Sequence, residues 1–134
     1  MIQNKIVVRY QDGKILKGQT SDFLPVKPTF HVSLIDSSPG DIPVEVQVSG
    51  LKAIFFVKDF IGNSEHKKVN EFKPGKSVSG RKISVAFKDG EKIVGTTQGY
   101  DPKRPGFFIV PADMDSNNER CFIVANAVKG VSFV

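Results

Sequence analysis

The chain has 134 residues, 40% hydrophobic and 25% charged, and its 19 Lys and Arg against 14 Asp and Glu give a net charge of +5. This length allows one domain or two very small ones, and the composition is typical of globular proteins, which excludes disordered, collagenous and coiled-coil classes. The longest wholly apolar run, residues 53–57, is far too short to cross a membrane, so we expect no membrane partner.

An internal repeat with a constant offset of 77 residues organises the chain. Residues 5–57 align with residues 82–134 without a gap, and 14 of the 53 positions are identical. The matched positions include Asp12 and Asp89, Gly13 and Gly90, Gly18 and Gly95, Pro25 and Pro102, Pro28 and Pro105, and Phe30 and Phe107. The sequence therefore predicts two copies of one unit, residues 1–57 and 82–134.

Each copy opens with a β-hairpin. Apolar residues alternate with others over residues 6–10 and 83–87, which is the period of a half-buried strand. Asp12-Gly13 and Asp89-Gly90 follow, and they predict a two-residue turn with positive φ at both central positions.

The second strand of each copy, residues 14–21 and 91–98, contains a glycine at Gly18 or Gly95. Glycine weakens a strand interior unless the backbone must bend sharply or pass close to another segment. A small closed barrel requires such a bend, so the two glycines favour barrel closure in both copies.

Three further strands complete each copy. A loop bracketed by prolines precedes an apolar strand that begins at Phe30 or Phe107, and two short strands end at Val57 or Val134. A unit of this size buries too little surface to be stable alone, which favours packing of the two copies. The predicted fold is all-β: two tandem five-stranded small β-barrels, packed together.

Residues 58–81 have no counterpart in the repeat and form a connector that carries much of the excess positive charge. The strand that precedes it is apolar on both faces, because Phe55 stands where the second copy has Ser132. An uncovered apolar strand invites aggregation, so its outer face should be covered. The candidates for this cover are the second copy, another subunit, or the connector residues Phe60, Ile61 and Phe72.

The second copy resembles the Sm-like small barrels, which bind RNA in rings. The resemblance lies in residues 85–90, Gly95, residues 100–101 and residues 123–128. It implies an Sm-like (Src-homology-3-like) barrel and, in the family, uridine binding. This chain departs from the RNA-contacting positions, since the base-contacting Asn is replaced by proline in both copies and the Arg-Gly pair by apolar residues. The prolines are Pro28 and Pro105.

Residues 51–60, 104–108, 111–113 and 116–118 are similar to an uncharacterised family of bacterial domains of unknown function. This resemblance covers nearly the whole chain. It implies a bacterial protein and brings no activity, substrate or cofactor with it.

No pattern of catalytic or metal-ligating residues stands out. His31 and His66 lie in different segments without a Cys or carboxylate at ligand spacing, so we predict no metal and no cofactor. The single cysteine, Cys121, lies in an apolar stretch where a thiol fills space in a packed strand. With no partner for a disulfide and no signal-peptide core, the chain is expected to be a cytoplasmic protein and not an enzyme.

The remaining hypotheses concern binding. The leading one is a non-enzymatic module that binds a protein partner through strand edges or the proline-bracketed loops, with a homo-oligomer among the alternatives. The runner-up is binding of single-stranded RNA or DNA, because basic residues next to aromatic rings attract phosphates and stack on bases. The candidate binding surface comprises Lys103, Arg104, Phe108, Lys67, Lys68, Lys73, Lys76 and Arg81.

Overall fold

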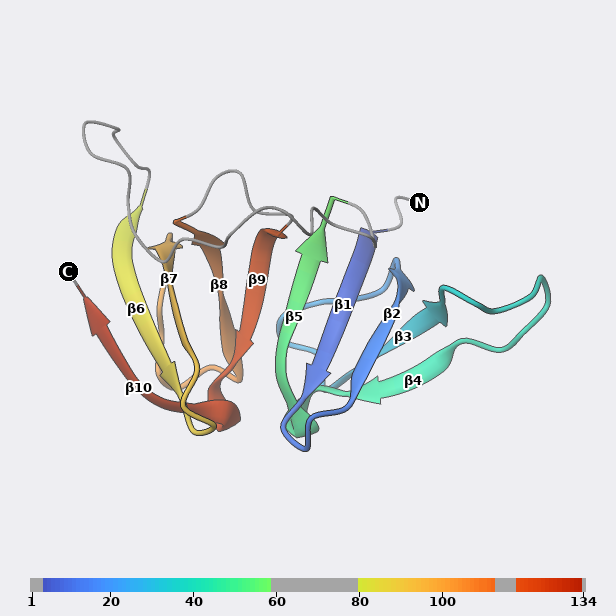
Figure 1. Cartoon of the computed structure of the whole chain (residues 1–134), viewed down its shortest axis with the longest axis horizontal. Helices are drawn as coiled ribbons and strands as arrows, with labels where there is room; N and C mark the ends of the chain where they lie inside the picture. Colours follow the sequence, from blue (N-terminus) through green and yellow to red (C-terminus); the bar gives the residue numbers. More distant parts are fainter. Residues whose placement is uncertain (1–3, 59–79, 113–117, 134) are drawn as a thin grey trace.

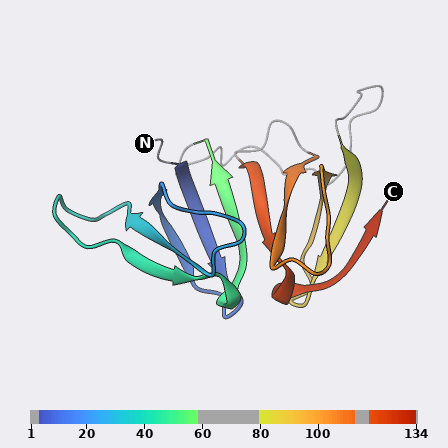
Figure 2. The ribbon, with the colours of Figure 1, turned by 180° about the vertical axis from the view of Figure 1, so that it is seen from behind.

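The computed structural model describes residues 4–58, 80–112 and 118–133, and this part of the chain is all β (Figures 1 and 2). Its elements are β1 (Asn4–Tyr10), β2 (Ile15–Thr20), β3 (Thr29–Leu34), β4 (Val44–Gln47), η1 (Val48–Gly50), β5 (Leu51–Val57), β6 (Arg81–Phe87), β7 (Lys92–Thr97), β8 (Gly106–Pro111), β9 (Asn118–Val124), η2 (Ala125–Ala127) and β10 (Val128–Phe133). The η elements are single 3₁₀ turns. Among the described residues, no helix has the length and apolar character needed to cross a membrane.

The elements of the two copies recur at the offset of the sequence repeat. Strand β6 begins and ends 77 residues after β1, and the same holds for β7 and β2, for β8 and β3, and for η2 and η1. We call β1–β5 the first half and β6–β10 the second half. In the sheet, the first half runs β5-β1-β2-β3-β4 and the second half runs β10-β6-β7-β8-β9, so the corresponding strands follow the same order.

The predicted pair of closed barrels is not what the strands form. They make one open, antiparallel ten-stranded sheet in the order β10-β6-β7-β8-β9-β5-β1-β2-β3-β4. The physical reason lies at the centre of the sheet, where β5 of the first half pairs with β9 of the second half. Because each of these strands bonds to the other half, neither half closes on itself. The sheet ends at β4 and β10.

The predicted hairpins are confirmed, but the predicted turn type is wrong. Gly13 and Gly90 have φ of 95° and 96°, and no other residue than glycine has positive φ in the described ranges. Asp12 and Asp89 therefore occupy ordinary backbone regions. Each turn is a three-residue loop that needs only one left-handed residue, and the aspartate carboxylate accepts the backbone N–H two residues later at 2.9 Å.

The close backbone approach expected at Gly18 and Gly95 is confirmed. A Cβ atom on Gly18 would overlap the Ser33 carbonyl oxygen, and one on Gly95 would overlap the Val110 carbonyl oxygen. These glycines let β2 approach β3, and β7 approach β8, so they serve the tight curvature of the sheet although the barrels stay open.

Two hydrophobic cores share the central strands. On β5, Phe56 packs into the core of the first half and Phe55 into that of the second half. On β9, Phe122 and Cys121 divide in the same way. The alternation of a strand sends successive side chains to opposite faces, so both strands are buried on both sides. The second copy thus covers Phe55, as one alternative predicted. The residues Phe60, Ile61 and Phe72 lie outside the described ranges.

A buried ion pair also joins the halves. Lys52 on β5 is 7% exposed, and its Nζ lies 2.7 Å from the Asp89 carboxylate and contacts that of Glu91, both on the β6–β7 turn. Burial alone lowers the pKa of Lys52, but the hydrogen bonds and the negative charge of the two carboxylates outweigh it and raise the pKa above its ordinary value. Lys52 therefore stays charged and anchors the turn to β5.

Candidate functional site

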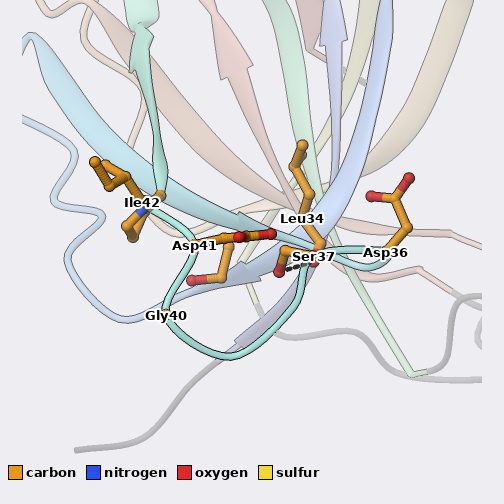
Figure 3. A pocket seen from close by; sticks show the side chains of 8 residues that line it. Leu34, Asp36, Ser37, Gly40, Asp41 and Ile42 are labelled. Atoms are coloured by element: carbon orange, nitrogen blue, oxygen red, sulfur yellow. Dashed lines mark hydrogen bonds between the residues drawn. The ribbon is translucent and has the colours of Figure 1, made fainter.

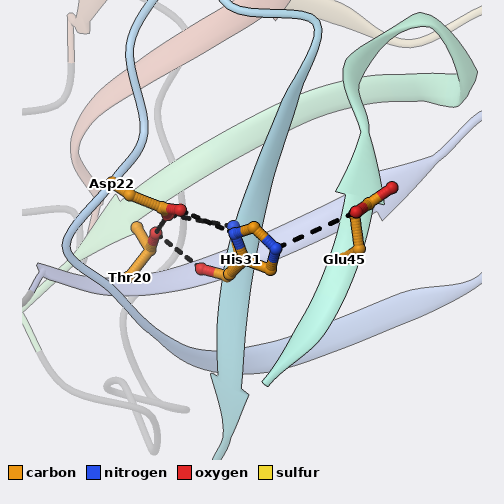
Figure 4. Close-up of polar contacts among 4 residues, drawn as sticks. All are labelled: Thr20, Asp22, His31 and Glu45. Atoms are coloured by element: carbon orange, nitrogen blue, oxygen red, sulfur yellow. Dashed lines mark hydrogen bonds and ion pairs between the residues drawn. The ribbon is translucent and has the colours of Figure 1, made fainter. Parts of the chain in front are cut away.

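Polar side chains gather on the outward face of β3 and β4, at the open end of the sheet (Figure 4). His31 on β3 lies opposite Glu45 on β4, while Thr20 ends β2 and Asp22 follows it. The His31 Nδ1 atom is 2.7 Å from the Asp22 carboxylate, and the His31 Nε2 atom is 3.9 Å from the Glu45 carboxylate. We call Thr20, Asp22, His31 and Glu45 the β3–β4 polar cluster.

Asp22 determines which nitrogen of His31 carries the proton. Loss of solvent raises the pKa of Asp22, but hydrogen bonds from the His31 amide and ring, with the Thr20 hydroxyl nearby, outweigh it and lower the pKa below its ordinary value. An ionised carboxylate only accepts hydrogen bonds, so Nδ1 must donate. In the neutral ring, Nε2 is then an acceptor that faces another acceptor, Glu45.

A hollow of about 530 Å³ adjoins the polar cluster, beneath the loop that joins β3 and β4 (Figure 3). Ser33 and Pro43, which follow His31 and precede Glu45 by two positions, belong to its lining. The remaining lining residues are Leu34, Asp36, Ser37, Gly40, Asp41 and Ile42. Ile42 is 90% exposed, so the rim of this acidic hollow carries a large apolar side chain in water.

The equivalent face of the second half is filled. Phe108 and Phe122 stand at the positions of His31 and Glu45, 77 residues later. Their rings pack against Phe23 of the first half, with ring centroids 6.2 Å and 5.1 Å apart. Alongside, β5 pairs with β9. The same face and edge that bind a segment of the chain in the second half are therefore open and polar in the first half.

A family model described as a family of unknown function, DUF6982, matches residues 2–134. The chain belongs to this family. The comparison with curated proteins and that with solved structures found no match. The match agrees with the uncharacterised family that the sequence resembles, and the DUF6982 description names no activity or ligand.

The basic residues predicted from the sequence reach different places in this DUF6982 domain. Lys103 and Arg104 are exposed in the loop between β7 and β8, where Arg104 lies 3.8 Å from the Asp101 carboxylate. Phe108 is half-buried among the aromatic rings of the first core, so it is not an exposed stacking platform. The predicted residues Lys67, Lys68, Lys73 and Lys76 lie outside the described ranges.

Sequence reasoning missed an aromatic group beside the remaining basic residue, Arg81. The Arg81 guanidinium lies 4.0 Å from the ring centroid of Phe133, whose ring is 5.7 Å from that of Tyr100. Phe133 is 38% exposed. Its repeat partner Phe56 is buried in the DUF6982 core, and that pairing concealed the exposed ring.

The β3–β4 polar cluster was missed as well, although a signal for it exists. In the DUF6982 repeat, a charged or polar residue faces a buried phenylalanine at two aligned positions, His31 with Phe108 and Glu45 with Phe122. Such a change marks a face that is buried in one copy and solvated in the other. Within the described ranges, no group of three or more His, Cys, Asp or Glu side chains is placed to hold a metal ion.

Proposed function

We propose that this DUF6982 domain is a non-enzymatic protein-binding module that receives an extended segment of a partner protein along β4. Strand β4 pairs with β3 on one side and ends the sheet on the other. An edge strand presents backbone N–H and C=O groups that an added strand can bond. The leading hypothesis from the sequence, binding through strand edges, thereby gains a specific edge.

One observation carries this proposal. In the second half, the strand that corresponds to β4 is β9, and it already pairs with an added strand, β5, from the other half. Five residue pairs join the two strands, from Ala53 opposite Ile123 to Val57 opposite Asn118. The fold thus uses this edge as an interface once, which supports the same use of β4.

Exposed apolar side chains beside β4 strengthen this assignment. Ile42 is 90% exposed, Ile35 is 56% exposed and Val44 is 36% exposed, and all three belong to the β3–β4 hairpin. Apolar surface of this kind marks interaction sites when it is grouped and rimmed by polar residues. A partner segment laid along β4 would cover it.

The substitution Ile42→Asp should weaken partner binding by about tenfold or more, since burying a single aliphatic side chain contributes about 1.5–3 kcal/mol. The probe is a set of nine-residue peptides selected on the intact chain from a random display library. Their affinities are measured by fluorescence anisotropy. Val110→Asp is the matched control, because Val110 is a 52% exposed apolar residue on β8. Equal affinities for both variants would contradict the proposal.

A second candidate, binding of single-stranded nucleic acid, is supported by the group of Arg81, Phe133 and Tyr100, near the exposed Lys103 and Arg104 in sequence. Base stacking contributes about 1–3 kcal/mol per base, so Phe133→Ala should weaken binding of an oligonucleotide by about tenfold. Filter binding over a salt series tests this. Affinity must fall as salt rises, because phosphate neutralisation releases counterions. An affinity that does not change with salt removes this candidate.

A further inference from the structure

We infer that the partner segment along β4 is basic, with a lysine or arginine side chain that enters the gap between His31 and Glu45. This inference rests on the proposed function and specifies the chemistry of its partner. It follows from the hydrogen-bonding capacity of the polar cluster, from the charge around the hollow and from the internal comparison with β9.

The gap between the His31 ring and Glu45 lacks a donor. The distance from Nε2 to the carboxylate is 3.9 Å, which is beyond hydrogen-bond range. With Nδ1 donating to Asp22, the neutral ring offers only an acceptor at Nε2. Both faces of the gap therefore accept hydrogen bonds. A lysine ammonium or an arginine guanidinium has several donors and no acceptor, and it would satisfy both at once.

The surroundings of the gap carry the complementary charge. The Glu45 side chain is 61% exposed and Asp22 has its pKa lowered, so the cluster holds two carboxylates around one imidazole. Further along the same edge, Asp36 and Asp41 line the hollow. A basic extended segment would meet negative charge at the cluster and again at the hollow. Ile42 and its apolar neighbours would contact the intervening side chains.

The comparison with β9 distinguishes this occupant from a second copy of the chain. On β9, Phe122 faces Ile54 of β5. The equivalent residue of β10 is Val131, so a second copy added in the same register would place a valine against the Glu45 carboxylate. It would also bring Pro43, which has no N–H, into the ladder at the position that corresponds to Arg120. The β4 edge is thus ill-suited to β10.

The test uses the peptides selected on the intact chain. We expect lysine or arginine at alternate positions of their consensus, since alternate side chains of an added strand face the same side. Glu45→Lys should weaken the best peptide by at least about tenfold. A peptide with glutamate in place of its essential basic residue should bind this variant better than the wild-type chain. Glu119→Lys, at an exposed position on β9, is the control and should leave both affinities unchanged.

The outcomes separate the two proposals. Peptides that lose affinity with Ile42→Asp but lack basic residues, or do not respond to Glu45→Lys, would overturn the basic partner and leave strand addition at β4 standing. Peptides that respond to neither variant would overturn both. Competition by a peptide of residues 128–134, or concentration-dependent dimerisation abolished by Glu45→Lys, would identify a second copy as the occupant and overturn the inference.

Discussion

Replacing Phe122 by alanine should lower the free energy of unfolding by about 3–5 kcal/mol, the cost of removing a fully buried aromatic ring from a core. Phe122 is 0% exposed, and its ring lies 5.1 Å from those of Phe23 and Phe108. It belongs to the second half by sequence but to the core of the first half by contact. Its loss therefore weakens the packing that joins the halves.

Equilibrium urea unfolding followed by far-ultraviolet circular dichroism measures this effect. Val110→Ala serves as the control, because Val110 is exposed on the neighbouring strand β8 and should change stability by no more than about 0.5 kcal/mol. A loss below about 1.5 kcal/mol for Phe122→Ala would mean that β9 does not pack into the first core.

The substitution Gly95→Ala should cost about 3 kcal/mol, the upper part of the range for overpacking. A Cβ at this position would overlap the Val110 carbonyl oxygen and lie 2.9 Å from the carbonyl carbon and 3.3 Å from the Pro111 Cα. All three are backbone atoms, so no side-chain rotation relieves the contact. The strand β7 would have to move away from β8, where the pairing spans only two residue pairs.

Thermal unfolding compares this variant with Gly130→Ala. Gly130 is also a strand glycine, but a Cβ there meets no atom within 4 Å. The control should be neutral or slightly stabilising, because alanine restricts the unfolded chain more than glycine does. Equal melting temperatures for the two variants would show that β7 and β8 do not approach as closely as described.

The elements were predictable from the sequence because their signals are local. Alternation of apolar residues located the first strand of each copy, and the Asp-Gly pairs located both hairpins. The sheet topology was not predictable in the same way. A repeat specifies which strands correspond, but the pairing of β5 with β9 depends on which edges meet in space. The contrast between Phe55 and Ser132 was the one trace of that junction in the sequence.

The candidate site was less accessible to sequence reasoning, for a related reason. Charge and aromatic content directed attention to Lys103, Arg104 and Phe108, yet only the strand pairing reveals that Phe108 packs within a core. The His31–Glu45 pair arises from strand register, and Asp22 reaches His31 from a preceding loop. Comparing the two copies position by position would have flagged both His31 and Glu45.

Amide hydrogen exchange by NMR, on the intact chain with and without a selected peptide, tests the role of β4 most directly. Backbone amides that gain a strand partner exchange more slowly, so we predict slower exchange within Val44–Gln47 and little change within Val128–Phe133, the other end of the sheet. Protection confined to β10 or to the β7–β8 loop, with β4 unchanged, would contradict docking at β4.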